Sequence, residues 1–127
     1  MPDDLPLISA EPRGDALVVT VHVESFDRTN AAPIQRAVEA AAAQWPQSAV
    51  ALDLGEVEML TSPGLGALVY LHTAFQGVNR RFGVCGARGE AAEALRAAQL
   101  HRLLDVYRSV GDFLLRLRSG SGASDGA

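Results

Sequence analysis

Hydrophobic residues along the chain fall into short strand-like runs that alternate with helix-like patterns. Residues 16–23 are β-branched and partly alternating, which predicts a strand, and Gly14-Asp15 predicts a hairpin turn just before it. An earlier strand over residues 5–8 would pair with it at an edge of a sheet, because it contains a proline. Residues 49–54 and 82–87 are apolar runs typical of strands buried on both faces, and residues 103–107 predict a last strand.

Four stretches between these runs carry apolar residues at helical spacing. The first is the alanine-rich stretch that runs to Trp45; Thr29 or Asn30 can cap its start, and Pro46 stops it. The others cover residues 63–77, 88–98 and 110–118, and the glycine- and serine-rich residues 119–127 predict a flexible tail. The residues predicted to face inward are Ile34, Val38, Ala41, Ala42, Trp45, Leu65, Leu68, Val69, His72, Phe75, Ala91, Leu95, Ala98, Phe113, Leu114 and Leu117.

This order of elements predicts the fold class. Strands and helices that alternate from Val50 onward imply parallel strands joined by right-handed crossovers, and the hairpin adds one strand at the edge. We therefore expect a single α/β domain over residues 1–118, with a mixed sheet of about five strands and about four helices.

Composition and charge narrow the class of protein. With 127 residues, 48% of them hydrophobic, the chain can form one domain with one core. The lone Cys85 excludes a disulfide within the chain and fits a reducing compartment. We expect neither a signal peptide nor a membrane span, and a net charge of −4 gives no drive toward nucleic acid or membranes. We therefore expect a cytoplasmic protein.

Motifs for catalysis, cofactors and metals are missing from the sequence. There is no Walker loop, no Gly-x-Gly-x-x-Gly after a strand, and no Gly-x-Ser-x-Gly around Ser62. The three histidines (His22, His72 and His101) have no partner at metal-ligand spacing, and packed or solvated side chains are their ordinary interpretation. Cys85 lies in an apolar strand, where an inert core thiol is expected. We expect no catalytic residue, no cofactor and no metal, hence a protein that is not an enzyme.

Residues 61–66, Thr-Ser-Pro-Gly-Leu-Gly, are the most informative segment. Pro63 suits the first position of a helix, which predicts Ser62 as its N-cap. Gly64 and Gly66 each cost about 1 kcal/mol of helix propensity, and they are useful where another surface approaches the backbone. A serine at an exposed helix start is also a favourable place for a phosphate. The residues alone leave open whether Ser62 is a cap only or also a modifiable switch.

A family resemblance rests on three segments. Residues 50–68, VALDLGEVEMLTSPGLGAL, resemble the signature of STAS domains, most closely the anti-sigma-factor antagonists of the SpoIIAA and RsbV type. Phe26-Asp27-Arg28-Thr29 resembles the family's opening of the first helix, and residues 99–107 resemble the stretch through its last strand. The likeness spans approximately residues 17–117 and implies a SpoIIAA-like STAS fold.

The resemblance implies a binding module that works as a switch. It implies that a partner anti-sigma serine kinase of the GHKL type phosphorylates Ser62, that the unphosphorylated form binds this kinase, and that a PP2C-type phosphatase resets it. The residues it places on the contact surface are Asp27, Thr29, Thr61, Ser62, Pro63, Gly64 and Leu65. For Asp27, capping of the first helix is an equal interpretation.

The chain departs from the family pattern on both sides of the serine. Thr61 replaces an acidic residue and Pro63 replaces a serine or threonine. A non-phosphorylated STAS scaffold therefore stays open, either stressosome-like or as a subunit of an ABC-type lipid transporter. A small nucleotide-binding domain is a third interpretation, although the chain has no phosphate loop.

Overall fold

The computed structural model describes residues 6–126, with side chains as far as residue 119. Five strands form one mixed sheet in the order β1-β2-β4-β6-β7. Their bounds are Ile8–Arg13, Ala16–Val21, Ala49–Asp53, Phe82–Cys85 and Val106–Tyr107. β1 is antiparallel to β2 and every other pair is parallel, so the predicted α/β class and mixed sheet are confirmed. A two-stranded sheet of β3 (Ser25–Phe26) and β5 (Met59–Leu60) adds a feature that the sequence did not predict.

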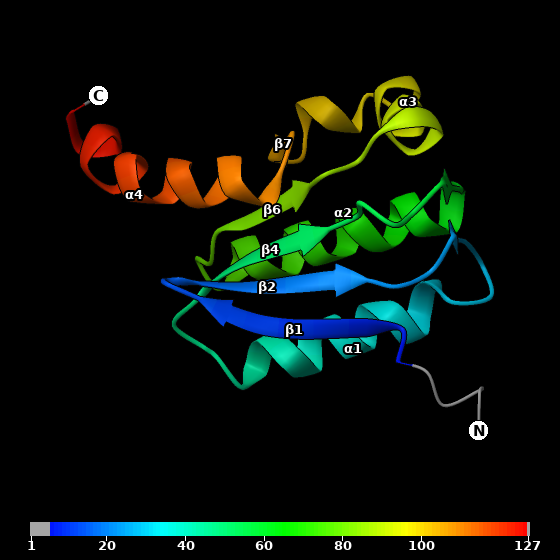
Figure 1. The fold of residues 1–127 in the computed structure, drawn as a ribbon, viewed down its shortest axis with the longest axis horizontal. Coiled ribbons are helices and arrows are strands. Elements are labelled where there is room, and N and C mark those ends of the chain that lie inside the picture. Colours follow the sequence, from blue (N-terminus) through cyan, green and yellow to red (C-terminus); the bar gives the residue numbers. More distant parts are fainter. Residues whose placement is uncertain (1–5, 127) are drawn as a thin grey trace.

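Helices cover both faces of the sheet unequally. α1 (Ala31–Ala43) and α2 (Ser62–Gly77) lie together behind it, whereas α4 (Val110–Gly126) crosses the other face (Figure 1). α3 (Gly89–Ala97) and a short 3₁₀ helix (Leu100–Arg102) connect β6 to β7. Successive parallel strands are added in one direction, and right-handed crossovers then place their helices on one face. α4 follows the last strand and is free to cover the other face.

Each central strand divides its side chains between two hydrophobic clusters. In β2, Leu17 and Val19 face the larger cluster, which contains α1 and α2, while Ala16 and Val18 face the smaller one under α4. Neighbouring side chains of a strand point to opposite faces, so a strand covered on both sides is apolar throughout. Phe113 of α4 is fully buried in the smaller cluster.

The ends of α1 and α2 are tied together by one arginine. The Arg80 guanidinium donates to the carbonyls of Ala42, Trp45 and Ser48 at 2.7–3.0 Å. The central carbon of the guanidinium group, Cζ, also lies 5.3 Å from the centre of the Phe75 ring. The Ala42 carbonyl lies in the last turn of α1, where a helix lacks internal donors, and the Trp45 and Ser48 carbonyls lie in the loop that follows.

Several predicted details are corrected by the structure. Trp45 lies beyond α1 with 43% of its surface exposed, because the helix ends at Ala43. Ala98 is exposed for the same reason beyond α3, and in α2 the inward position belongs to Leu71 while His72 is half-buried. The first strand begins only at Ile8, and the predicted strand over 103–107 shrinks to β7.

The C-terminal end of α4 also differs from its predicted end. α4 continues through Gly126, whereas the glycine- and serine-rich composition predicts a flexible tail from Ser119. The side chains of residues 120–127 lie outside the described part of the chain. Among the helices of residues 6–126, none is both long and apolar enough to cross a bilayer.

Candidate functional site

The small sheet of β3 and β5 brings together two of the three segments that carry the family resemblance, residues 26–29 and residues 50–68. Its strands run parallel, with Ser25 beside Met59 and Phe26 beside Leu60. The chain leaves both strands at the same end, so Asp27 and Thr61 emerge side by side. The Phe26 carbonyl accepts the Thr61 N–H at 3.2 Å and the Thr61 hydroxyl at 3.3 Å, which fixes the start of α2 to the start of the α1 loop.

Asp27 organises the loop that leads into α1. Its Oδ1 accepts the backbone N–H and the hydroxyl of Thr29, at 2.9 and 2.6 Å, and its Oδ2 accepts the Ser25 hydroxyl at 2.8 Å. The hydrogen bonds from Thr29, and then from Ser25, lower the pKa of Asp27 below its ordinary value of 3.8. Asp27 is therefore an ionised and firmly oriented carboxylate that holds the turn before α1. The prediction that it caps the helix is wrong, because the N-cap of α1 is Asn30 and the Asp27 carboxylate binds only residues that precede the helix.

The N-cap of α2 is Thr61 and not, as the sequence predicts, Ser62. Thr61 is extended, and its carbonyl accepts the Leu65 N–H at 2.8 Å as the first bond of the helix. Ser62 is the first helical residue and Pro63 follows it. Within the described part of the chain the exposed Ser62 hydroxyl has no hydrogen-bond partner, so it stands free at the N-terminus of a sixteen-residue helix.

Gly64 is required by packing inside the protein. It is buried, and a Cβ there would lie 2.4 Å from the Phe26 carbonyl oxygen and 2.9 Å from Leu60 Cδ1. The surface that approaches this glycine is thus the chain's own β3–β5 sheet. That differs from the predicted role of Gly64 as a point of approach for a partner.

The predicted contact residues lie in two adjoining segments. Thr29, Ser62 and Pro63 are exposed, whereas Asp27, Thr61 and Leu65 are half-buried. Leu65 also packs against the larger core cluster. The exposed part of the predicted surface therefore consists of Thr29, Ser62 and Pro63.

Two residues that build this site were missed in the sequence. Ser25 holds the Asp27 carboxylate, and the Phe26 carbonyl receives Thr61. Asn30 adds a third element, since its Oδ1 accepts the Asp27 N–H at 2.9 Å and its Nδ2 donates to the Ser25 carbonyl at 2.8 Å. The density of Ser, Asp, Thr and Asn over residues 25–30 is the signal of such a hydrogen-bonded turn. No local pattern signals the role of the Phe26 carbonyl.

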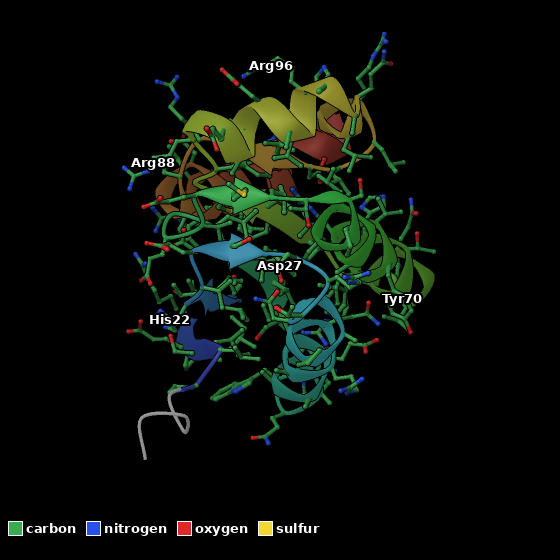
Figure 2. The ribbon with its side chains drawn as sticks, turned by 90° about the vertical axis from the view of Figure 1, so that its right-hand side faces the viewer. His22, Asp27, Tyr70, Arg88 and Arg96 are labelled. Atoms are coloured by element: carbon green, nitrogen blue, oxygen red, sulfur yellow. The ribbon has the colours of Figure 1, made fainter. Side chains whose placement is uncertain are left out.

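A second polar cluster lies elsewhere in the molecule. His22 is 2.8 Å from the Ser9 hydroxyl and 3.0 Å from a Glu56 carboxylate oxygen. In the end-on view of Figure 2, His22 and Tyr70 of α2 lie on opposite sides of the molecule. All three residues of the cluster are exposed. We interpret their hydrogen bonds as a structural link between the edge strand β1 and the β4–β5 loop.

The single cysteine of the chain lies in the smaller core cluster. Cys85 is buried, and desolvation raises the pKa of its thiol to about 12. The predicted core position of this thiol is therefore confirmed. Among the described residues, no group of three or more His, Cys, Asp or Glu side chains could hold a metal ion.

Together, these elements form a small α/β domain with an exposed serine at the start of α2. The family model of the STAS domain matches residues 8–113. The chain therefore belongs to the STAS family, and the resemblance inferred from the sequence is confirmed. A comparison with curated proteins found no match.

Solved structures share the fold. An anti-sigma factor antagonist from Mycobacterium paratuberculosis is similar with a TM-score of 0.77 and 28% identity, over 87% of this chain and 92% of that one. An anti-sigma-factor antagonist (STAS) domain protein from Planctomyces limnophilus has a TM-score of 0.75 and 19% identity, over 87% and 97%. The murine anion transporter Solute Carrier 26 family member A9 matches with a TM-score of 0.73 and 14% identity, over 83% of this chain but 18% of that one.

Proposed function

We propose that this protein is an anti-sigma-factor antagonist whose Ser62 is a reversible phosphorylation switch. The unphosphorylated form binds a GHKL-type anti-sigma serine kinase, and a PP2C-type phosphatase restores it. The similarity to the mycobacterial antagonist supports the role. The observation that carries the switch is the free, exposed hydroxyl of Ser62 at the start of α2.

The position of Ser62 suits both the addition and the effect of a phosphate. The N-terminus of a helix stabilises an anion through its dipole and free N–H groups. A phosphate adds about −1.5 to −2 charges at neutral pH, and a partner that covers this position has to desolvate them. Phosphorylation therefore preserves the fold and weakens docking.

The first experiment tests the modification itself. The purified GHKL-type kinases of the source organism are each incubated with the protein and ATP, and the modified residue is mapped by mass spectrometry. We expect phosphate on Ser62 and none on the Ser62→Ala variant. Thr61→Val is the matched control, because the Thr61 hydroxyl is occupied by the Phe26 carbonyl. Phosphate that is absent, or found only at another residue, contradicts the switch.

One observation favours a second candidate function. Thr61 and Pro63 flank the serine where the family pattern has an acidic residue and a hydroxyl, and both changes remove features that a kinase could recognise. A non-phosphorylated STAS scaffold or transporter-associated subunit would keep the same fold. A stable complex with an ABC-type ATPase or with other STAS domains, and no phosphate on Ser62, would select this alternative.

A further inference from the structure

Ser9, His22 and Glu56 form a continuous chain of hydrogen bonds across one end of the sheet. The Ser9 oxygen lies 2.8 Å from His22 Nε2, and His22 Nδ1 lies 3.0 Å from Glu56 Oε1. Ser9 belongs to β1, His22 follows β2 and Glu56 follows β4, and these strands are neighbours in the sheet. The bonded pairs are 13 and 34 residues apart in the sequence, so no local motif contains the three residues.

The carboxylate determines which nitrogen of His22 carries the proton. A carboxylate can only accept hydrogen bonds, so in the neutral imidazole Nδ1–H donates to Glu56. Nε2 then carries the lone pair and accepts the Ser9 hydroxyl. A serine that donates to a histidine, which a carboxylate holds from its other side, is the arrangement of the Ser-His-Asp/Glu hydrolases. Both distances lie within the reach of about 2.6–3.2 Å that a nucleophile and its general base require.

The residue after the serine supplies a backbone N–H at the edge of the sheet. β1 is an edge strand, and the Leu7 carbonyl accepts the His22 N–H at 2.7 Å. Hydrogen-bonded pairs alternate along an antiparallel ladder, so Ala10, opposite Val19, directs its N–H away from β2. In α/β-hydrolases the N–H of the residue after the nucleophile helps to bind the oxyanion. Pro12 occupies the next position of the same kind, where its missing N–H removes no bond of the ladder.

We propose that Ser9, His22 and Glu56 form an esterase site, a second activity that is independent of the phosphorylation switch. The Ser9 oxygen attacks the carbonyl carbon of an ester, and the hydroxyl proton passes to His22 Nε2. When the ester C–O bond breaks, His22 gives this proton to the departing alcohol and the acyl group stays on Ser9. A water molecule then attacks the acyl group and transfers a proton to His22, which returns it to Ser9 as the carboxylic acid leaves.

The surroundings of Ser9 indicate the class of substrate. Glu11 lies two residues further along the same face of β1, and Glu56 adds a second negative charge, so anionic substrates are disfavoured. Ser9 is exposed, so the site does not exclude water and provides little binding energy. We therefore expect turnover of small, uncharged, activated esters with a high KM.

The experiment follows hydrolysis of 4-nitrophenyl acetate by the whole protein and locates the acyl group by mass spectrometry of acid-quenched samples. We expect acetyl on Ser9, and a hydrolysis rate that falls at least about tenfold in Ser9→Ala and in His22→Ala. His101→Ala is the matched control for the background reaction of surface imidazoles, because His101 is exposed and lies outside the cluster. This variant is expected to keep the wild-type rate.

Two further variants separate catalysis from a structural role of the cluster. Ala10→Pro removes one outward N–H, and Pro12 shows that this strand accepts proline at such a position, so we expect a lower kcat in a folded protein. Glu56 is a positioning residue, because it acts through His22. Glu56→Gln is expected to lower kcat and leave KM unchanged, since an amide can bond to Nδ1 but does not stabilise the imidazolium. Circular dichroism checks that each variant is folded.

The outcomes decide the esterase site without involving Ser62. Acetyl on Ser9, together with loss of activity in Ser9→Ala and His22→Ala, supports the site. Acetyl that is absent from Ser9, or a rate that is equal in Ser9→Ala and the wild type, overturns it, and the cluster then serves only as a structural link. Neither result changes the expected phosphorylation of Ser62, which is tested separately with the kinases.

Discussion

At the scale of single residues, the site depends on hydrogen bonds and close contacts that surround Ser62 but leave its hydroxyl free. The Asp27 carboxylate is held by Ser25 and Thr29, and Gly64 lets the start of α2 approach the Phe26 carbonyl. The sequence predicted Asp27, Thr29 and Ser62 as site residues because the motifs contain them. It assigned the N-cap to Ser62 because the dipeptide Ser-Pro fits that position locally. The bond from Thr61 to Phe26, 35 residues away, moved the cap by one position, and no local pattern contains such a bond.

Asp27 makes stability depend on pH in one direction. Its pKa is lowered in the folded protein by Thr29 and Ser25, so the stabilisation is fully present above pH 3.8 and is lost as the pH falls through the lower, folded pKa. Asp27→Asn keeps an acceptor for Thr29 but removes the charge. We expect the wild type to exceed this variant in unfolding free energy at pH 6, and the difference to shrink at pH 3. Urea unfolding at both pH values measures it, and a difference that does not change with pH contradicts the assignment.

We expect the substitution Gly64→Ala to lower the stability of the protein, although helix propensity alone predicts that alanine would raise it. In Gly64→Ala the new methyl group would collide with the Phe26 carbonyl oxygen, a backbone atom that cannot turn away. We expect a net loss of about 1–3 kcal/mol in the free energy of unfolding, measured by urea titration. A variant as stable as the wild type, or more stable, would show that α2 can shift away from β3.

At the scale of elements, the sequence predicted the helices and the central strands well and their ends less well. Continuous apolar runs identify β4 and β6, since both are buried on two faces. Two-residue strands such as β3 and β5 carry too few positions for a periodicity, so they were missed. The Ala42 carbonyl in the last turn of α1 accepts a hydrogen bond from Arg80, which lies 37 residues after Ala43 and is brought there only by the fold.

Arg80 provides a prediction at this scale. Lysine keeps the positive charge but cannot direct several N–H groups in one plane toward the carbonyls of Ala42, Trp45 and Ser48. We expect Arg80→Lys to lower the free energy of unfolding by about 1.5–3 kcal/mol, measured by urea titration. Arg81→Lys, the exposed neighbour, is the matched control and is expected to be neutral. Equal stability of the two variants would mean that the bonds of Arg80 do not hold the two helices together.

At the scale of the whole molecule, the helices on one face of the sheet carry the candidate site, and the helix on the other face covers the smaller core cluster. α1 and α2 cover one face and carry the site at their N-terminal ends, while α4 closes the other face (Figure 1). The nearly continuous apolar runs of β2 and β4 predict that both faces of the sheet are covered. The crossover rule assigns the connecting helices to one of these faces. On the second face, Phe113 of α4 packs directly over Gly83 of β6. A Cβ at Gly83 would lie 2.5 Å from the Phe113 ring, so a larger residue there would displace this ring.

The rate at which a thiol reagent modifies Cys85 measures whether α4 stays packed on the sheet. Its pKa of about 12 leaves a thiolate fraction of about 10⁻⁴ at pH 8, and Phe113 packs in the same buried cluster. We expect a disulfide reagent at pH 8 to leave the folded protein unmodified and to label it fully in guanidinium chloride. Phe113→Ala should lose about 3–5 kcal/mol of stability and label faster, whereas Leu115→Ala, an exposed position on α4, should behave like the wild type. Because the site lies on the other face, folded Phe113→Ala should still be phosphorylated at Ser62. Rapid labelling of the folded wild type would mean that α4 opens readily, and that the second face is not part of a stable core.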